Sequence, residues 1–168
     1  MALATGDDTE WAASVGRALA RRTVLWRALA RHDEEERRPV RMLVTPRYEA
    51  WVIGWAPGQA VELHDHGNAA GAVVVTEGML TELRLADGVR TQADLGAGSV
   101  QLLPVGLVHE VWNPGPSVAT SIHVYSPVLT HMGRYDLDTG KRIGTELIAA
   151  EEPALPSAAS AVLLHPAG

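Results

Sequence analysis

Three histidines have the residue type and the spacing to bind a metal ion: His64, His66 and His109. Residues two apart in a β-strand point to the same side, so His64 and His66 would aim two imidazoles into one space while Asp65 turns away. A metal held by neutral imidazoles needs a third ligand, and His109 lies in another strand-like segment, residues 107–111. The chain contains no cysteine, so any metal must be held by nitrogen and oxygen atoms.

Glycines, a proline and an asparagine surround these histidines in two blocks. The first block contains His64 and His66 and the second contains His109; the other members are Gly58, Gly78, Gly98, Pro104, Gly106 and Asn113. The blocks resemble the two motifs of the cupin superfamily, and Gly71 stands where that superfamily usually places a fourth ligand, a glutamate. The resemblance implies a cupin-type antiparallel β-barrel, or jelly roll, that holds a metal ion.

Gly71 changes the chemistry expected at the metal. Three neutral imidazoles leave the charge of a divalent ion uncompensated, which favours anionic ligands. A thiolate would neutralise part of that charge, and coordination would lower the pKa of the thiol. Three alternatives stay open: a cupin without metal, a non-catalytic cupin that binds a small molecule, and a zinc or manganese cupin that acts as an isomerase or decarboxylase.

Ser121, His123 and Tyr125 alternate along a further strand-like segment. The alternation places a hydroxyl, an imidazole and a phenol on one face of the strand. Burying three polar groups there would be costly unless they bonded one another or a ligand. The pattern therefore predicts a proton and hydrogen-bond relay.

With this relay added, residues 40–129 resemble the cysteine dioxygenase family of thiol dioxygenases. The resemblance implies that the three histidines hold Fe(II). It also implies that dioxygen oxidises a small thiol, L-cysteine in the first place, to its sulfinic acid. Tyr125 would be the active-site tyrosine, supported by Ser121 and His123. Animal members crosslink this tyrosine to a cysteine; the present chain has no cysteine, so Tyr125 must act unmodified.

Cysteine-specific members of that family bind the substrate carboxylate through an arginine on an early strand, which suits planar bidentate recognition. Arg41 matches best in local pattern and Arg47 is the second candidate, although either could be a surface arginine at a strand end. Where glutamine replaces the arginine, members prefer thiols that lack an α-amino group, such as 3-mercaptopropionate. The sequence leaves the choice of thiol open.

The length of 168 residues suits one domain with a single core, and 16 glycines and 10 prolines indicate many turns. Residues 40–148 contain short apolar runs separated by turn residues, whereas residues 9–36 have apolar positions at helical spacing. We therefore expect a mainly β fold in three parts: an N-terminal helical segment (1–37) packing on a cupin barrel (38–150), and a loosely packed or disordered tail (151–168).

The formal net charge of -6 argues against nucleic acid and anionic lipid as partners. The longest apolar runs fall far below the roughly 18 residues that span a bilayer. We expect a cytoplasmic protein, monomeric or homodimeric, whose partners are a small thiol and dioxygen.

Overall fold

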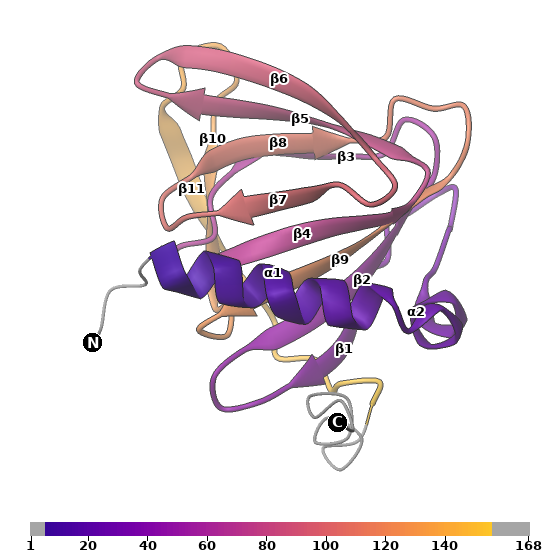
Figure 1. Ribbon diagram of the computed structural model, residues 1–168. Coiled ribbons are helices and arrows are strands. Elements are labelled where there is room, and N and C mark those ends of the chain that lie inside the picture. The colour runs from indigo at the N-terminus through magenta and orange to yellow at the C-terminus, as the bar shows by residue number, and fades with distance from the viewer. Residues whose placement is uncertain (1–5, 156–168) are drawn as a thin grey trace.

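The computed structural model describes residues 6–155 (Figure 1). They form two helices followed by eleven strands. The helices are α1 (Gly6–Ala20) and α2 (Thr23–Leu29). The strands are β1 (Val40–Val44), β2 (Glu49–Trp55), β3 (Ala60–His64), β4 (Ala70–Glu77), β5 (Met79–Ala86), β6 (Val89–Gly96), β7 (Val100–Leu103), β8 (Val108–Trp112), β9 (Ala119–Ser126), β10 (His131–Tyr135) and β11 (Arg142–Leu147).

The strands form two antiparallel sheets that face each other (Figure 1). One sheet has the order β1-β2-β9-β4-β7, and the other has the order β11-β10-β3-β8-β5-β6. Many neighbours within a sheet are far apart in sequence, as expected for a jelly roll rather than a meander. The arrangement confirms the predicted mainly β fold with N-terminal helices.

Strand β9 lies between β2 and β4, and its eight residues are all buried. Because side chains alternate along a strand, Ile122 and Val124 point to the outer face of the five-stranded sheet, where they join the apolar cluster under α1. Tyr125 points to the inner face and joins the cluster between the two sheets. The same alternation places Ser121 and His123 on the inner face with Tyr125; the sequence predicted that these three residues share one face.

Helix α1 covers the outer face of the five-stranded sheet (Figure 1). Its buried face carries small residues, including Ala12 and Ala13, which allow the helix axis to approach the strands closely. At Gly16, a Cβ atom would lie only 2.9 Å from the Cγ2 atom of Val74 in β4. With the outer face closed by the helix, the space between the sheets is left for a site.

The end of the described chain runs beside β1. The backbone N–H groups of Ala154 and Leu155 donate to the carbonyls of Arg41 and Met42. Residues 156–168, most of the tail expected to be loosely packed, lie outside the described residues. The division of the chain at residues 37 and 150 stays a prediction. Over residues 6–155, neither helix has the length and apolar character needed to cross a membrane.

Candidate metal centre and its cavity

The three predicted ligands converge at one point between the sheets. His64 ends β3, His66 follows in the next loop, and His109 in β8 is the antiparallel partner of His64. One nitrogen atom from each ring lies within 4.8 Å of the others, and all three side chains are buried. The ring centroids of His64 and His109 are 4.6 Å apart. The structure therefore brings together the three histidines that the sequence selected.

Hydrogen bonds at Nδ1 orient two of these rings. His64 Nδ1 lies 2.8 Å from the carbonyl oxygen of Glu62, and His109 Nδ1 lies 2.7 Å from Oε1 of Glu82. In each ring Nδ1 donates its proton to the oxygen acceptor, so that Nε2 is unprotonated and has a free lone pair. His109 Nε2 is buried and has no hydrogen-bond partner among the described residues. An unpartnered buried nitrogen aimed at two other imidazoles is what a metal ligand requires.

Glu82 contacts a predicted metal ligand, and the sequence did not indicate this contact. Burial alone would raise the pKa of Glu82, but hydrogen bonds from His109 and Arg84 lower it below its ordinary value. The carboxylate beside His109 is therefore charged, and its Oε2 atom lies 2.9 Å from Nε of Arg84. The only signal in the sequence was an acidic residue two positions after the apolar Leu80 in a strand. The contact of Glu82 with His109 depends on the pairing of β5 with β8, which the sequence pattern does not reveal.

The donor set fits a transition metal ion. Burial, and next the electrostatic effect of the neighbouring His109 imidazole, lower the pKa of His64 and His66 well below the ordinary value. Both rings are therefore neutral near pH 7, the form in which imidazole binds metals. Imidazole ligands suit iron, zinc, copper and nickel, so three of them do not by themselves select one metal.

Gly71 pairs with Tyr125 across β4 and β9. A Cβ atom at Gly71 would lie 2.4 Å from the carbonyl oxygen of Val124 and 2.9 Å from Cδ1 of Tyr125. No side chain fits there, so a glutamate ligand is excluded by the backbone and by the tyrosine ring. The ring of Tyr125 lies instead beside the metal ligands, with its centroid 4.8 Å from that of His66.

Ser121, His123 and Tyr125 form the predicted relay. Ser121 Oγ lies 2.8 Å from His123 Nε2, and His123 Nδ1 lies 3.0 Å from the hydroxyl oxygen of Tyr125. Burial, and next the charge of Arg37, lower the pKa of His123 to about 3. Burial, and next the charge of Glu49, raise the pKa of Tyr125. Near pH 7 the relay therefore consists of uncharged groups.

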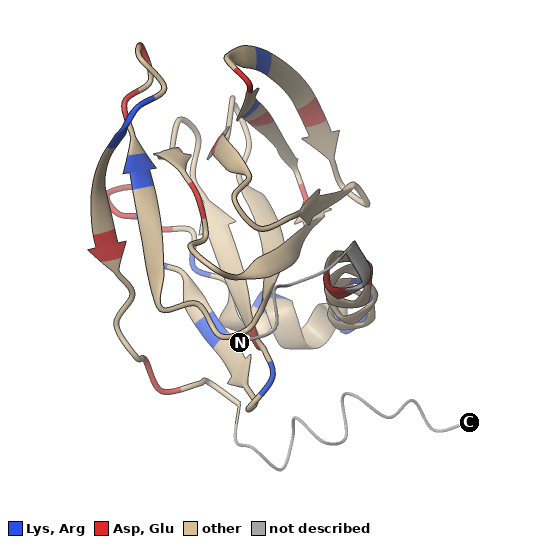
Figure 2. Ribbon diagram, turned by 90° about the vertical axis from the view of Figure 1, so that its left-hand side faces the viewer, with Lys and Arg blue, Asp and Glu red and all other residues tan. Residues whose placement is uncertain are grey.

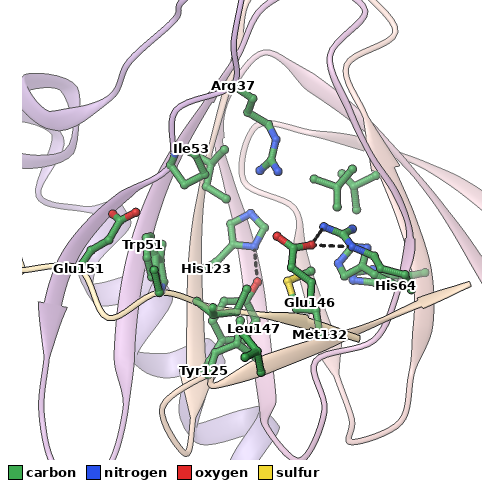
Figure 3. A pocket seen from close by; sticks show the side chains of 18 of the residues that line it. Arg37, Trp51, Ile53, His64, His123, Tyr125, Met132, Glu146, Leu147 and Glu151 are labelled. Atoms are coloured by element: carbon green, nitrogen blue, oxygen red, sulfur yellow. Dashed lines mark hydrogen bonds and ion pairs between the residues drawn. The ribbon is translucent and has the colours of Figure 1, made fainter. Parts of the chain in front are cut away.

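A cavity of about 340 Å³ opens beside the histidines (Figure 3). Its lining includes His64, His109, His123 and Tyr125, together with apolar side chains such as Trp51. Ser121 and His66 are not part of the lining. The volume suits a small molecule, and a mostly apolar wall with few polar groups is typical of ligand sites.

Neither Arg41 nor Arg47 is part of the lining of this cavity. Arg41 is buried and forms an ion pair of 2.8 Å with Glu49, while its Nη1 donates to the carbonyl of Glu151. Arg47 is exposed, stacks over Trp11 and forms an ion pair with Asp8. The Arg41 guanidinium carbon lies 5.8 Å from the ring centroid of Trp51 in the cavity wall, and the role of either arginine in binding a substrate carboxylate stays a prediction.

Two other arginines line the cavity instead. Arg37 points into it from the segment between α2 and β1 (Figure 3), with its guanidinium carbon 5.1 Å from the ring centroid of Trp55. No carboxylate of residues 8–155 forms an ion pair with it, and burial lowers its pKa. Arg134 is already paired with Glu146 across the hairpin of β10 and β11, which carries both kinds of charge (Figure 2). Of the two arginines among the described residues that line the cavity, Arg37 is therefore the one available for an anionic ligand.

Asp65 turns away from the histidines, as the sequence predicted. Its carboxylate holds in place the loop that contains His66. Its Oδ1 accepts hydrogen bonds from the backbone N–H groups of Gly67 and Gly133, and its Oδ2 accepts one from the hydroxyl of Tyr135. The carboxylate thus ties the loop that contains His66 to β10, which forms one wall of the cavity. This linkage fixes the spacing between the metal ligands and that wall.

Comparison with known proteins supports a cupin-type fold and indicates a family. The sequence model for cysteine dioxygenase type I matches residues 7–138. A structure from Thermus thermophilus is similar with a TM-score of 0.55 and 24% identity, over 61% of this chain and 93% of that one. An uncharacterized Klebsiella pneumoniae protein with a double-stranded β-helix domain is similar with a TM-score of 0.54 and 22% identity, over 74% and 95%. A cupin superfamily protein from Desulfitobacterium hafniense is similar with a TM-score of 0.51 and 13% identity, over 59% and 84%. These structural likenesses show a cupin-type fold.

Proposed function

The chain belongs to the cysteine dioxygenase type I family, and we propose that it is an Fe(II)-dependent dioxygenase that converts a small thiol to its sulfinic acid. The thiol carries a carboxylate, and L-cysteine is the first candidate. 3-Mercaptopropionate, which has the carboxylate but no amino group, is the alternative substrate.

The observation that carries the proposal is the convergence of three imidazoles at the edge of one small cavity, which His64, His109 and Tyr125 line. His109 Nε2 is buried without a partner among the described residues, and the Tyr125 ring packs against His66. Since Gly71 leaves no room for a carboxylate ligand, the ion keeps its positive charge and open positions for an anionic thiolate. A cupin that only stores a small molecule would not need this relay of buried polar groups.

When bound, Fe(II) would supply the redox chemistry that activates dioxygen and would lower the pKa of the thiol. The residues of the chain position the reactants. Arg37 binds the carboxylate, and the apolar wall that includes Trp51 and Leu129 excludes water. Tyr125 places its hydroxyl at the cavity wall, where its raised pKa keeps it protonated and able to donate a hydrogen bond.

Oxygen uptake by the iron-loaded protein tests the proposal. The panel contains L-cysteine, 3-mercaptopropionate, mercaptosuccinate and cysteamine, of which only the last lacks a carboxylate. We expect uptake with at least one carboxylate-bearing thiol, formation of its sulfinic acid, and loss of both in His109→Ala. Absence of uptake with every thiol, at full iron occupancy, would leave a non-catalytic cupin as the better account.

The role of Arg37 is tested separately by Arg37→Gln. A charged hydrogen bond to a carboxylate contributes enough that its loss raises KM for the carboxylate-bearing thiol by about tenfold or more. Arg38→Gln is the matched control, because Arg38 is the next residue and its side chain pairs with Asp33 at the surface. An unchanged KM in Arg37→Gln would remove Arg37 from the substrate site.

A further inference from the structure

Trp55 adds a fourth member to the polar relay. Its indole Nε1 donates a hydrogen bond of 2.9 Å to Ser121 Oγ, across the paired strands β2 and β9. Both residues are fully buried. An indole N–H is a donor only and never an acceptor, so the direction of this hydrogen bond is fixed.

The fixed direction at Trp55 determines the next hydrogen bond. Ser121 Oγ has two partners in the described structure, Trp55 Nε1 and His123 Nε2. Because Ser121 accepts from the indole and is shielded from solvent, its own hydroxyl proton can be satisfied only by His123 Nε2. His123 Nε2 is therefore an acceptor and carries no proton.

The site of the proton on His123 in turn determines which group donates in the hydrogen bond between His123 and Tyr125. A neutral imidazole has one proton, and with Nε2 unprotonated that proton is on Nδ1. His123 Nδ1 therefore donates to the hydroxyl oxygen of Tyr125, 3.0 Å away. The phenolic proton of Tyr125 is not used by His123 and is free to point into the cavity.

We propose that Trp55 is a positioning residue that sets the direction of the whole relay, so that Tyr125 presents a hydrogen-bond donor to the cavity. In the reverse direction, both Trp55 and His123 would donate to Ser121, and the serine hydroxyl proton would be buried without an acceptor. An unsatisfied buried donor disfavours that arrangement by about tenfold or more. The role of Tyr125 as donor to a bound reactant rests on the proposed function, whereas the tautomer of His123 does not.

The tautomer can be measured directly by NMR. Long-range ¹H–¹⁵N correlations of the ¹⁵N-labelled full-length chain, loaded with diamagnetic zinc, distinguish a protonated Nδ1 from a protonated Nε2. The signals of His123 are assigned by their loss in His123→Gln. We expect protonation at Nδ1 alone in the unmodified chain. Protonation at Nε2 would overturn the proposal without any variant.

Trp55→Phe keeps an aromatic ring but removes the donor. We expect at least a tenth of His123 to shift to the Nε2 tautomer, because Ser121 can then donate or accept. Trp51→Phe is the matched control: Trp51 lies on the same strand and faces the same cavity, but its Nε1 has no partner in the described structure. His123 should stay protonated at Nδ1 in that control. The same single tautomer in Trp55→Phe would show that the indole does not set the direction.

The two proposals fail in different ways. If no thiol supports oxygen uptake but His123 is protonated at Nδ1 in a Trp55-dependent manner, the proposed function fails and the positioning role of Trp55 stands. If thiol oxidation occurs and His123 is protonated at Nε2, the enzyme assignment stands and Trp55 is only a packing residue.

Discussion

Glu82 accepts a hydrogen bond from His109 across the neighbouring strands β5 and β8, at 2.7 Å between Oε1 and Nδ1. This contact fixes the ring so that its Nε2 atom faces the other two histidines. It also supplies a negative charge next to a metal site that has no carboxylate ligand of its own among the described residues.

Glu82→Gln should therefore weaken metal binding by roughly 10–100-fold, the usual effect of losing a carboxylate that supports a ligating histidine. Competition titration with a metal-sensitive dye measures the affinity. Glu110→Gln is the control, since Glu110 adjoins His109 along β8 but lies on the opposite face of the sheet. Equal affinities of the two variants would show that the Glu82 contact does not support the metal.

Gly71→Ala should destabilise the fold even though it adds a single methyl group. The new Cβ would meet the Val124 carbonyl oxygen at 2.4 Å, and a backbone atom cannot move aside cheaply. Overpacking of this kind costs about 1–3 kcal/mol of the free energy of unfolding. Thermal unfolding followed by circular dichroism measures it. Gly144→Ala in β11, where nothing in the described structure lies within 4 Å of the added Cβ, should leave the unfolding temperature nearly unchanged.

Arg41→Met should lower stability strongly, because it leaves the buried carboxylate of Glu49 without its ion-pair partner. Breaking a buried ion pair from one side costs about 3–5 kcal/mol. Urea unfolding of the metal-free protein measures the loss. If Arg41→Met has the same free energy of unfolding as the unmodified chain but a higher KM for the thiol, Arg41 contacts the substrate. That result would contradict the structural role of Arg41 as the ion-pair partner of Glu49.

The buried His123 makes stability depend on pH in a definite direction. Its pKa is about 3 in the folded protein against an ordinary value of 6.5. Between these values the unfolded chain binds a proton that the folded protein does not, so acidification below pH 6.5 favours unfolding. The contribution is about 1.4 kcal/mol per pH unit and vanishes above pH 6.5.

Urea unfolding at several pH values between about 7 and 4 tests this prediction. In His123→Gln, the free energy of unfolding should fall less steeply on acidification. The difference between the two slopes should correspond to the uptake of about one proton on unfolding. His64 and His66 contribute equally to both curves, so the difference between the slopes isolates His123. Identical slopes would mean that His123 is accessible to protons in the folded state.

The sequence was sufficient for the features that depend on short-range patterns. Alternation along β9 predicted that Ser121, His123 and Tyr125 share one face, and the structure confirms the relay. The spacing of His64 and His66 likewise predicted two rings aimed at one point. For the relay, strand geometry alone fixes the relation of the three side chains. For His66 it does not, because β3 ends at His64 and His66 lies in the loop that Asp65 holds against β10.

The arginines could not be placed in this way, because their positions depend on contacts between distant segments. Arg37 belongs to an irregular connection that is held over the barrel by a hydrogen bond from Gln59 Nε2 to the Asp33 carbonyl. Arg41 meets Glu49 through the pairing of β1 with β2, whose register shifts between Arg41 and Leu43. Neither the hydrogen bond nor the register shift follows from periodicity.

The proposed function requires that the three-histidine site directs both atoms of dioxygen to the sulfur of a thiol. Mass spectrometry of the product formed under ¹⁸O₂ by the iron-loaded protein tests it most directly. We predict a sulfinic acid that carries two ¹⁸O atoms, and no such product from His109→Ala. A product with only one labelled oxygen, or a disulfide in place of the sulfinic acid, would contradict the claim.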